Sequence, residues 1–224
     1  MRQVWDWGYV AEVLPLLLRG LLVTFQLTVL SLVIALTLGL LLAVLRLSSQ
    51  AWISLPAKWF IEFVRSTPLL VQLYFLYYVG PSFGLVMSPF LTGVIGLGVH
   101  FSTFTAEVYR AGIQNVPSGQ WEAARSLNLS TYWTWRSIVL PQAIASVIPA
   151  LGNYCLSMFK ETPVLIGISV VEMLGEAQRA ASQTYQYLEP LTLAGALFFI
   201  VSYPLSKVLR WLETVTKSHF GARQ

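Results

Sequence analysis

Charged residues are scarce in this sequence of 224 residues. Asp, Glu, Lys and Arg make up 11% of it, whereas soluble domains usually carry about a quarter. A single cysteine, Cys155, excludes an internal disulfide and any metal site built from several cysteines. No glycine is followed by lysine, so the phosphate-binding loop of ATPases is missing. We therefore expect a chain that is not an enzyme and that holds neither a metal nor a cofactor.

Long apolar runs are what the sequence has instead. Hydrophobic residues make up 56% of it, and several runs exceed the roughly 20 residues that a helix needs to cross a bilayer. We expect an all-α membrane protein whose residues 1–224 form one integral membrane domain. The five predicted spans cover residues 15–45, 60–80, 87–111, 139–171 with an interruption, and 187–213.

The basic residues predict the orientation, because Lys and Arg gather in cytoplasmic loops. They cluster at residues 46–65, 125–136 and 207–223, which follow the first, third and fifth spans. The alternate loops carry no charge at 79–88 and mainly Glu at 172–189. The N-terminus is therefore expected outside and the C-terminus in the cytoplasm. Because the net charge of +4 follows from this bias, the predicted contact is with membrane lipid and not with nucleic acid.

A polar segment, residues 114–141, separates two apolar runs on the predicted cytoplasmic side. Ser118 is expected to be the N-cap of a short helix, which Asn128 would end in the left-handed conformation. Ser130 would cap a second helix, and Pro141 would end or kink it. The two helices would form an elbow on this face of the membrane.

The first helix of the elbow is expected to have an apolar face and a charged edge. Trp121, Ala124 and Leu127 share one face, and Glu122 and Arg125 form an i,i+3 pair beside it. A helix resting on the inner leaflet is the alternative interpretation, but such helices usually carry more Lys and Arg than this one.

The fourth predicted span is too long for one helix. Residues 142–171 would extend about 45 Å, against a hydrocarbon core of about 30 Å. Pro163 lacks a backbone donor and disfavours helix at Thr162, so we expect a break there. Residues 65–71 repeat the pattern of residues 160–166, in which Thr-Pro follows a base and precedes three aliphatic residues. This repeat predicts a second break, with Thr as N-cap of the following helix in both places.

Broken helices and ionisable groups at membrane depth are typical of solute pathways. The candidates for such a pathway are Lys160, Glu161, Thr162, Asn153, Gln72, His100 and Ser102. Lys160 lies just before a predicted helix N-terminus, whose dipole favours a nearby anion. A solute carboxylate is the ligand that we expect there.

Structural interpretations of these residues stay open. Arg65 can be an anchor at the inner interface, and Lys160 and Glu161 can neutralise each other. Asn153 can serve helix packing, and Gln72 can satisfy backbone groups that the preceding proline leaves unpaired.

Five stretches of the sequence resemble one protein family, in the same order. They are FIEFVRSTPLLVQLYFLYY (60–78), AEVYRAGI (106–113), VPSGQWEAA (116–124), LPQA (140–143) and PALGNYCLSMFKETPVL (149–165). The chain resembles permease subunits of bacterial ATP-driven (ABC) importers, in the branch for polar amino acids such as histidine, glutamine and arginine. Glu122-Ala123-Ala124 resembles the EAA motif of these subunits. Where they usually have glycine, this chain has Asn128, which also tolerates positive φ.

The resemblance implies a type I importer core in the bacterial inner membrane, with the elbow as its coupling helix. The residues implied in contact with a separate cytoplasmic ATPase are Trp121, Glu122, Ala123, Ala124, Leu127 and Asn128. Glu122 would pair with a cation of the ATPase, and the apolar residues would pack against it. The implied partners are an ATP-binding subunit dimer, a second permease subunit, identical or paralogous, and an external solute-binding protein.

The sequence is compatible in part with three alternatives. The solute could be a compatible solute such as ectoine, because buried charges of both signs suit any small zwitterion. An ion-coupled secondary transporter would explain broken helices but not the folded segment at residues 114–141. A membrane-embedded hydrolase would need a nucleophile–base pair, and the nearest approach, His100 with Ser102, points to two different helix faces.

Overall fold

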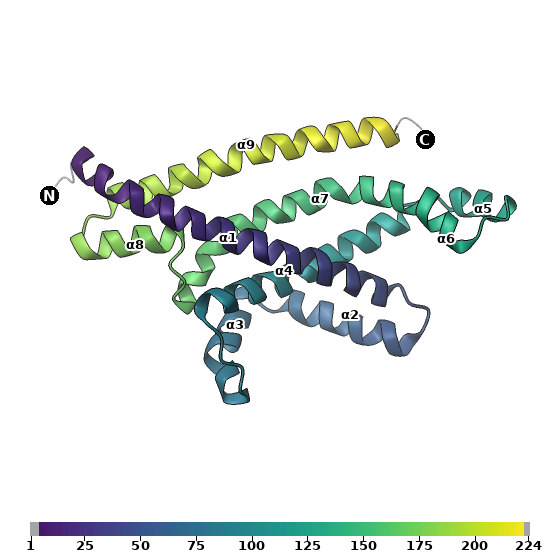
Figure 1. The fold of residues 1–224 in the computed structure, drawn as a ribbon, viewed down its shortest axis with the longest axis horizontal. Helices are drawn as coiled ribbons and strands as arrows, with labels where there is room; N and C mark the ends of the chain where they lie inside the picture. Colours follow the sequence, from purple (N-terminus) through teal and green to yellow (C-terminus); the bar gives the residue numbers. More distant parts are fainter. Residues whose placement is uncertain (1–4, 222–224) are drawn as a thin grey trace.

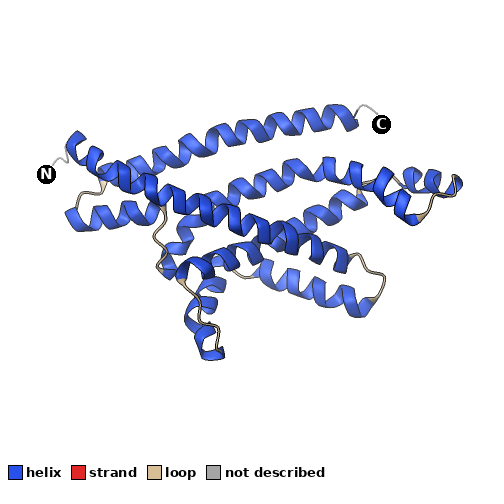
Figure 2. Ribbon diagram, viewed as in Figure 1, coloured by secondary structure: helices blue, strands red, loops and turns tan. Residues whose placement is uncertain are grey.

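The structure is a computed structural model that describes residues 5–221, with the side chains of residues 5–211, 213 and 214. All regular secondary structure in residues 5–221 is helical (Figure 2). Among the basic residues near the C-terminus, Arg223 and the side chain of Lys217 lie outside this description.

Helical segments of three types follow one another along the chain. The α-helices are α1 (Trp7–Arg46), α2 (Ala51–Ser66), α3 (Leu69–Tyr74), α4 (Pro89–Gln114), α5 (Ser118–Ser126), α6 (Thr131–Thr134), α7 (Leu140–Glu161), α8 (Met173–Thr184) and α9 (Leu188–Gly221). The π-helical segments are η1 (Phe75–Val79) and η3 (Trp135–Val139), and the 3₁₀ segments are η2 (Gly80–Phe83) and η4 (Thr162–Ile168).

The long helices α1, α4, α7 and α9 run roughly along the longest axis of the molecule (Figure 1). Helix α8 lies beside the beginning of α1 at one end, which we call the α8 end. The short helices α5 and α6 lie at the opposite end, which we call the elbow end. Helix α3 points sideways out of the bundle (Figure 1).

Four helical stretches are long and apolar enough to cross a membrane, within the described residues. They are α1, α4, the continuous stretch Thr131–Ile168 and residues Leu188–Trp211 of α9. The span predicted at residues 60–80 is not among them, and the break predicted within it is present. Pro68 has extended backbone (ψ 139°) and so does Thr67 before it, which separates the 16 residues of α2 from the apolar stretch Leu69–Phe83. A residue before proline avoids the helical conformation, so the break follows from the Thr-Pro pair.

The central packing contact joins α1 and α4. The Ser31 hydroxyl donates to the Val94 carbonyl (3.1 Å), and the Thr105 hydroxyl donates to the Ala35 carbonyl (2.7 Å). A Cβ atom added to Gly39 would lie 2.9 Å from a carbonyl oxygen of α4. Small residues and hydroxyls thus allow the two backbones to approach closely, as is usual between membrane helices.

A buried carboxylate ties α1 to the start of α8. Glu172 is fully buried and accepts hydrogen bonds from the Gly175 N–H (2.8 Å) and from the Thr24 hydroxyl (3.2 Å) of α1. Burial raises the pKa of the Glu172 carboxyl, and these hydrogen bonds oppose that rise. Gly20 lies one turn before Thr24 and leaves room for the backbone of Met173.

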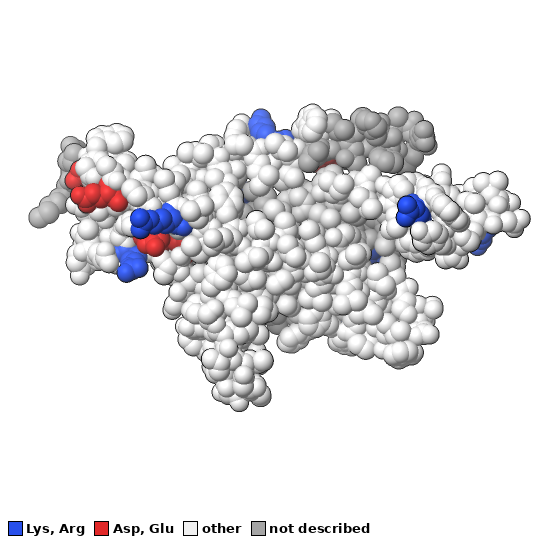
Figure 3. Space-filling view, in the orientation of Figure 1, with Lys and Arg blue, Asp and Glu red and all other residues white. Residues whose placement is uncertain are grey.

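Ion pairs join three helices towards the elbow end. Arg46, the last residue of α1, has its Nη1 atom 3.0 Å from Glu107 Oε1 of α4 and 3.9 Å from Glu62 Oε1 of α2. The first contact is ionic and not an aligned hydrogen bond, since neither atom has a hydrogen-bond partner. Arg110 donates to Glu107 Oε2 from two nitrogens (2.8 and 3.1 Å). On the face drawn in Figure 3, most charged residues lie towards the two ends, with a broad uncharged band between them.

The approach of α1 to the α8 segment predicts the effect of Gly20→Val. A Cβ at Gly20 would lie 2.7 Å from the Met173 Cα, so the backbone itself must move. We expect a loss of about 1–3 kcal/mol in the free energy of unfolding, measured by thermal unfolding in detergent. Gly195→Val is the matched control, because nothing lies within 4 Å of a Cβ there. Equal melting temperatures for the two variants would contradict the close packing.

Candidate functional site

The boundaries of the elbow agree with those predicted from its residues, except that the first helix is capped one residue earlier. Helix α5 begins at Ser118, and its N-cap is Pro117, so the prediction of a capping Ser118 side chain was wrong. Pro117 has an extended ψ (139°), and its missing backbone N–H costs nothing there, because the first donors of a helix have no partner within the helix. Asn128 adopts φ 50°, which confirms the predicted left-handed turn. The Asn128 and Leu129 N–H groups then satisfy carbonyls of the last turn of α5.

The second part of the elbow is continuous with the following span. The Ser130 side chain caps α6 by accepting from the Trp133 N–H at 3.5 Å, as predicted. Pro141 does not end the helix, which was one of the two predicted outcomes, and the other, a kink, stays a prediction. The π-helical turn η3 precedes it, and the Gln142 side-chain amide donates to the Ile138 carbonyl (2.9 Å) nearby. The wider turn lets α6, η3 and α7 form one rod from Thr131 onwards.

The residues predicted to form one apolar face of α5 do not all face the same way. Ala124 is buried within the chain, and the Trp121 ring meets the Trp135 ring edge to face at 5.4 Å. Trp121 also packs on a small core that contains Val139 and Ala143 at the start of α7. Leu127, by contrast, is 72% exposed. Trp121 and Ala124 therefore attach α5 to the rest of the chain.

The outward surface of α5 is polar with one large apolar side chain. Its exposed residues include Glu122, Ala123, Arg125, Leu127 and Asn128. Glu122 and Arg125 are not within ion-pair distance of each other, so the predicted i,i+3 pair does not form in the described chain. The Glu122 carboxylate and the Leu127 side chain are both free to contact another molecule.

The fourth span changes helix type where Pro163 predicts a break. The α-helix α7 ends at Glu161, the 3₁₀ segment η4 follows, and Ser169 ends it with φ 64°. Thr162 keeps helical φ and ψ and its hydroxyl donates to the Phe159 carbonyl (3.0 Å). The two Thr-Pro sequences therefore differ, since Thr67 is extended where Thr162 is helical. The prediction that Thr caps a new helix in both places was wrong.

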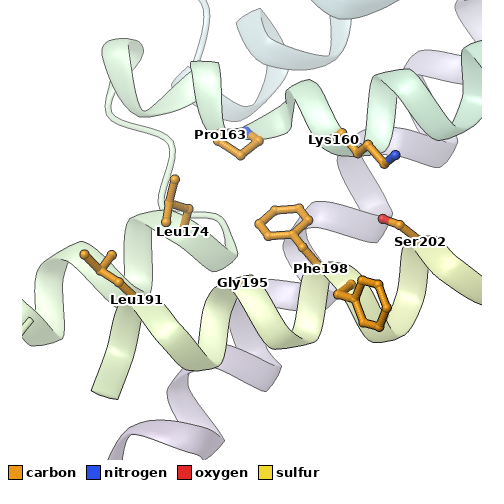
Figure 4. Close-up of a pocket in the computed structure, with 8 residues that line it drawn as sticks. Lys160, Pro163, Leu174, Leu191, Gly195, Phe198 and Ser202 are labelled. Atoms are coloured by element: carbon orange, nitrogen blue, oxygen red, sulfur yellow. The ribbon is translucent and has the colours of Figure 1, made fainter. Parts of the chain in front are cut away.

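Lys160 lines a groove between α7 and α9. The groove has a volume of about 410 Å³ and is lined by Lys160, Pro163, Leu174, Leu191, Gly195, Phe198, Phe199 and Ser202. The Lys160 and Ser202 side chains point into it from the two helices (Figure 4). Ser202 is buried, and its hydroxyl has no hydrogen-bond partner in the described chain. No ion pair joins Lys160 to Glu161, so mutual neutralisation is not what the described residues show.

Gln72 closes the break between α2 and α3. Its Nε2 atom donates to the Val64 carbonyl (2.7 Å) and to the carbonyl and hydroxyl of Thr67 (3.1 and 2.7 Å). These acceptors identify the nitrogen of the amide, so its oxygen is the atom 3.1 Å from His100 Nδ1. His100 therefore donates from Nδ1. The prediction that Gln72 satisfies backbone freed by Pro68 is confirmed.

The remaining candidates, His100, Asn153 and Ser102, lie in three different surroundings. His100 is part of an aromatic cluster, in which its ring lies 5.3 Å from the Phe104 ring and Phe104 lies 5.6 Å from Tyr154. Asn153 is exposed two turns before Lys160, on the same face of α7. Ser102 is fully buried, and its hydroxyl donates to the Val99 carbonyl (2.7 Å) within α4.

Ser102 lies on the face of α4 that packs against α1, as Gly98 and Thr105 do. Its buried hydroxyl serves that helix contact, and its place in the pathway stays a prediction. Sequence reasoning also missed two features. Ser202 lies in a predicted apolar span. Its polar side chain is the only signal in the sequence that could have identified it. The Arg65 guanidinium carbon lies 5.2 Å from the centre of the Phe104 ring, a contact between two helices that no spacing indicates.

Comparison with known proteins decides the family. Residues 35–214 match the family described as the inner membrane component of binding-protein-dependent transport systems. The chain belongs to this family. It is a permease subunit of a binding-protein-dependent ABC importer, a multi-pass protein of the bacterial inner membrane, and it supplies no catalytic residue.

Several curated permeases are similar to it. A probable amino-acid ABC transporter permease of Sinorhizobium fredii is 45% identical over 93% of both chains. The nopaline transport system permease of Agrobacterium fabrum is 33% identical over 97% of this chain and 95% of that one. The octopine transport system permease of Rhizobium radiobacter is 32% identical over 93% and 89%. None of these is an ectoine permease, so the ectoine alternative has no support here.

Solved structures give the same fold. A crystal structure of an amino acid ABC transporter with histidines aligns with a TM-score of 0.89 at 37% identity, covering 95% of this permease and 99% of that chain. An inward-facing methionine ABC transporter aligns with a TM-score of 0.69 at 18% identity over 88% and 96%, which shows the fold alone. The permease therefore has the type I importer fold, and permeases of this kind pair with ATPase subunits.

The Gln72 contacts predict a loss of stability in Gln72→Leu. The carbonyl of Thr67 loses its donor, and an unpaired buried polar group costs about 1–3 kcal/mol. We expect a lower melting temperature in detergent. Gln178→Leu is the control, because Gln178 is exposed on α8. If the two variants melt alike, the amide does not hold the α2–α3 break together.

Proposed function

We propose that this permease forms half of the translocation pathway for a polar amino acid or an amino-acid derivative. The support is the resemblance over nearly the whole chain to permeases named for amino acids, nopaline and octopine. Lys160 and the polar groups beside the helix breaks suit a solute that carries charges of both signs. A chain of this size cannot enclose a pathway alone, so a second permease subunit completes it.

The proposed topology has five crossings with the N-terminus outside. The second crossing consists of α2, α3 and the η1–η2 segment in succession, because no single helix covers that part of the chain. The elbow lies at the end where α1 stops at Arg46 and α4 stops at Gln114. Exposed basic residues at the elbow, Arg125 and Arg136, favour the cytoplasm for that end. The α8 end then faces outwards, where the solute-binding protein docks.

The proposed solute contacts lie on faces that this chain leaves open. Lys160 and Asn153 share an exposed face of α7, and Glu161 is half-buried beside them. The Lys160 ammonium meets the solute carboxylate, and the Ser202 hydroxyl is available to it as a second donor. Gln72 and His100 lie deeper at the α2–α3 break, where they position the backbone beside the pathway.

The elbow carries the proposed coupling to the ATPase. The single observation that carries the function is the exposed, folded helix α5 at the far end of the bundle (Figure 1). Glu122 pairs with a cation of the ATPase, and Leu127 contacts its surface. Trp121 passes the movement of α5 to Trp135 and so to α7, whose other end holds Lys160.

Glu122→Lys tests the coupling. We expect it to abolish ATP-dependent uptake into vesicles that hold the permease with its ATPase, second permease and binding protein, because it puts like charge against a cation. The solutes offered are cationic, neutral and acidic amino acids, with ATP inside or absent. Lys58→Glu reverses an exposed charge on α2, away from α5 and from the α8 end, and is expected to keep uptake.

Two outcomes would contradict the proposal. Uptake by Glu122→Lys equal to that of the wild type would remove Glu122 from the ATPase contact. Uptake driven by a proton or sodium gradient without ATP would replace the importer with an ion-coupled transporter.

A further inference from the structure

Arg65 lies beyond the layer of paired charges at the elbow end. That layer contains Arg46, Glu62, Glu107 and Arg110, which pair with one another. Arg65 belongs to the last turn of α2, and its guanidinium lies over Phe104, three residues deeper along α4 than Glu107. It is exposed, and no acidic side chain in the described part of the chain pairs with it.

An interface anchor would place this side chain differently. Helical side chains point towards the N-terminus of their own helix, and the N-terminus of α2 lies at the elbow end. Arg65 could therefore reach the layer around Glu107 at little cost. Its guanidinium instead lies over the Phe104 ring at 5.2 Å, away from that layer. The anchor interpretation of Arg65 does not explain this position.

The surroundings of Arg65 are aromatic and neutral. Phe104 covers one face of the guanidinium, and the rings of His100 and Tyr154 lie beside Phe104. Because His100 donates from Nδ1 to Gln72, Nε2 is the ring nitrogen that is left for other groups. When one face of a guanidinium lies on a ring, the N–H donors along its edge stay free. These donors can form two parallel hydrogen bonds with the two oxygens of a carboxylate.

We propose that Arg65 is a second carboxylate-binding residue of the pathway, on the cytoplasmic side of Lys160. The inference rests on the proposed import of a zwitterionic solute. Tyr154, which adjoins the Arg65 site through Phe104, precedes Lys160 by six residues of α7, or about 9 Å along the helix axis at 1.5 Å per residue, and faces a different side of the helix. The Arg65 site is therefore nearer to the cytoplasmic end than Lys160, so a solute meets Lys160 first and Arg65 later on its way in. Arg65 raises the selectivity for solutes that carry a free carboxylate.

The single native cysteine makes a charge-restoration test possible. In a Cys155→Ala background, Arg65→Cys is expected to lower ATP-dependent uptake of L-arginine, L-glutamine or L-glutamate, whichever the parent transports, by about 10- to 100-fold. A cationic thiosulfonate reagent that adds a trimethylammonium group is expected to restore most of the uptake. The anionic sulfonate reagent is expected to leave it low, and added solute is expected to slow both reactions.

Two control variants accompany the test. Lys58→Cys removes an exposed cation from the same helix, and we expect uptake close to that of the parent with either reagent. Arg65→Lys retains the charge without the fork of donors and is expected to lose less uptake than Arg65→Met. This second pair keeps the test informative if the cysteine variant fails to fold.

Several results would overturn the inference. One is uptake by Arg65→Met equal to that of the parent. Another is an equal effect of the two reagents on Arg65→Cys. A third is loss of the second permease from the purified complex of an Arg65 variant, which would assign Arg65 to pairing between subunits. The proposed function fails separately, if the parent itself shows no ATP-dependent uptake. ATP-dependent uptake that does not change when Arg65 is replaced contradicts only the carboxylate-binding role of Arg65.

Discussion

The packing of Trp121 against Trp135 is the contact on which this account depends. Helix α5 is a short, largely exposed helix, and few of its side chains reach the rest of the molecule. The aromatic pair and the buried Ala124 fix its position on the rod formed by α6, η3 and α7. Aromatic pairs in this geometry contribute about 0.5–1.5 kcal/mol beyond their buried area. Without this contact, a force on α5 would reach α7 only through the buried Ala124 and the connecting backbone.

The helix breaks have different structural roles. At Thr67 and Pro68 the backbone turns out of the helix, and Gln72 replaces the lost backbone hydrogen bonds. At Thr162 the α-helix tightens into a 3₁₀ segment without an extended residue between them, so Lys160 lies in the last turn of α7. The rod therefore joins the elbow to the groove between α7 and α9. Arg65 and Lys160 lie at the two breaks, each three residues before the proline of its break.

Much of this arrangement could be predicted from the sequence, because local signals set it. The long apolar runs predicted α1, α4 and α9, the left-handed Asn128 followed from its side chain, and the Gln72 contact followed from the nearby proline. The family model confirmed the importer class that the EAA-like segment suggested.

Other features depend on contacts between distant residues, which spacing alone cannot give. Ala124 and Leu127 lie one turn apart, yet only the first is buried. Ser102 turned out to face α1, since the small residues Gly39 and Gly98 bring those backbones together. The continuity of the helix through Pro141 required a π-turn, which has no clear sequence signal.

The central claim is that α5 and α7 move as one body, and a distance measurement tests it most directly. Spin labels at Gln120→Cys of α5 and Ile144→Cys of α7, both exposed positions, would be placed in a Cys155→Ala background of the assembled transporter. The account predicts the same distance between these labels without nucleotide and with trapped ATP. A pair at Gln120→Cys and Leu41→Cys of α1 should change its distance on ATP binding. A change in the α5–α7 distance would contradict the claim, because the Trp121–Trp135 contact would then not transmit the movement.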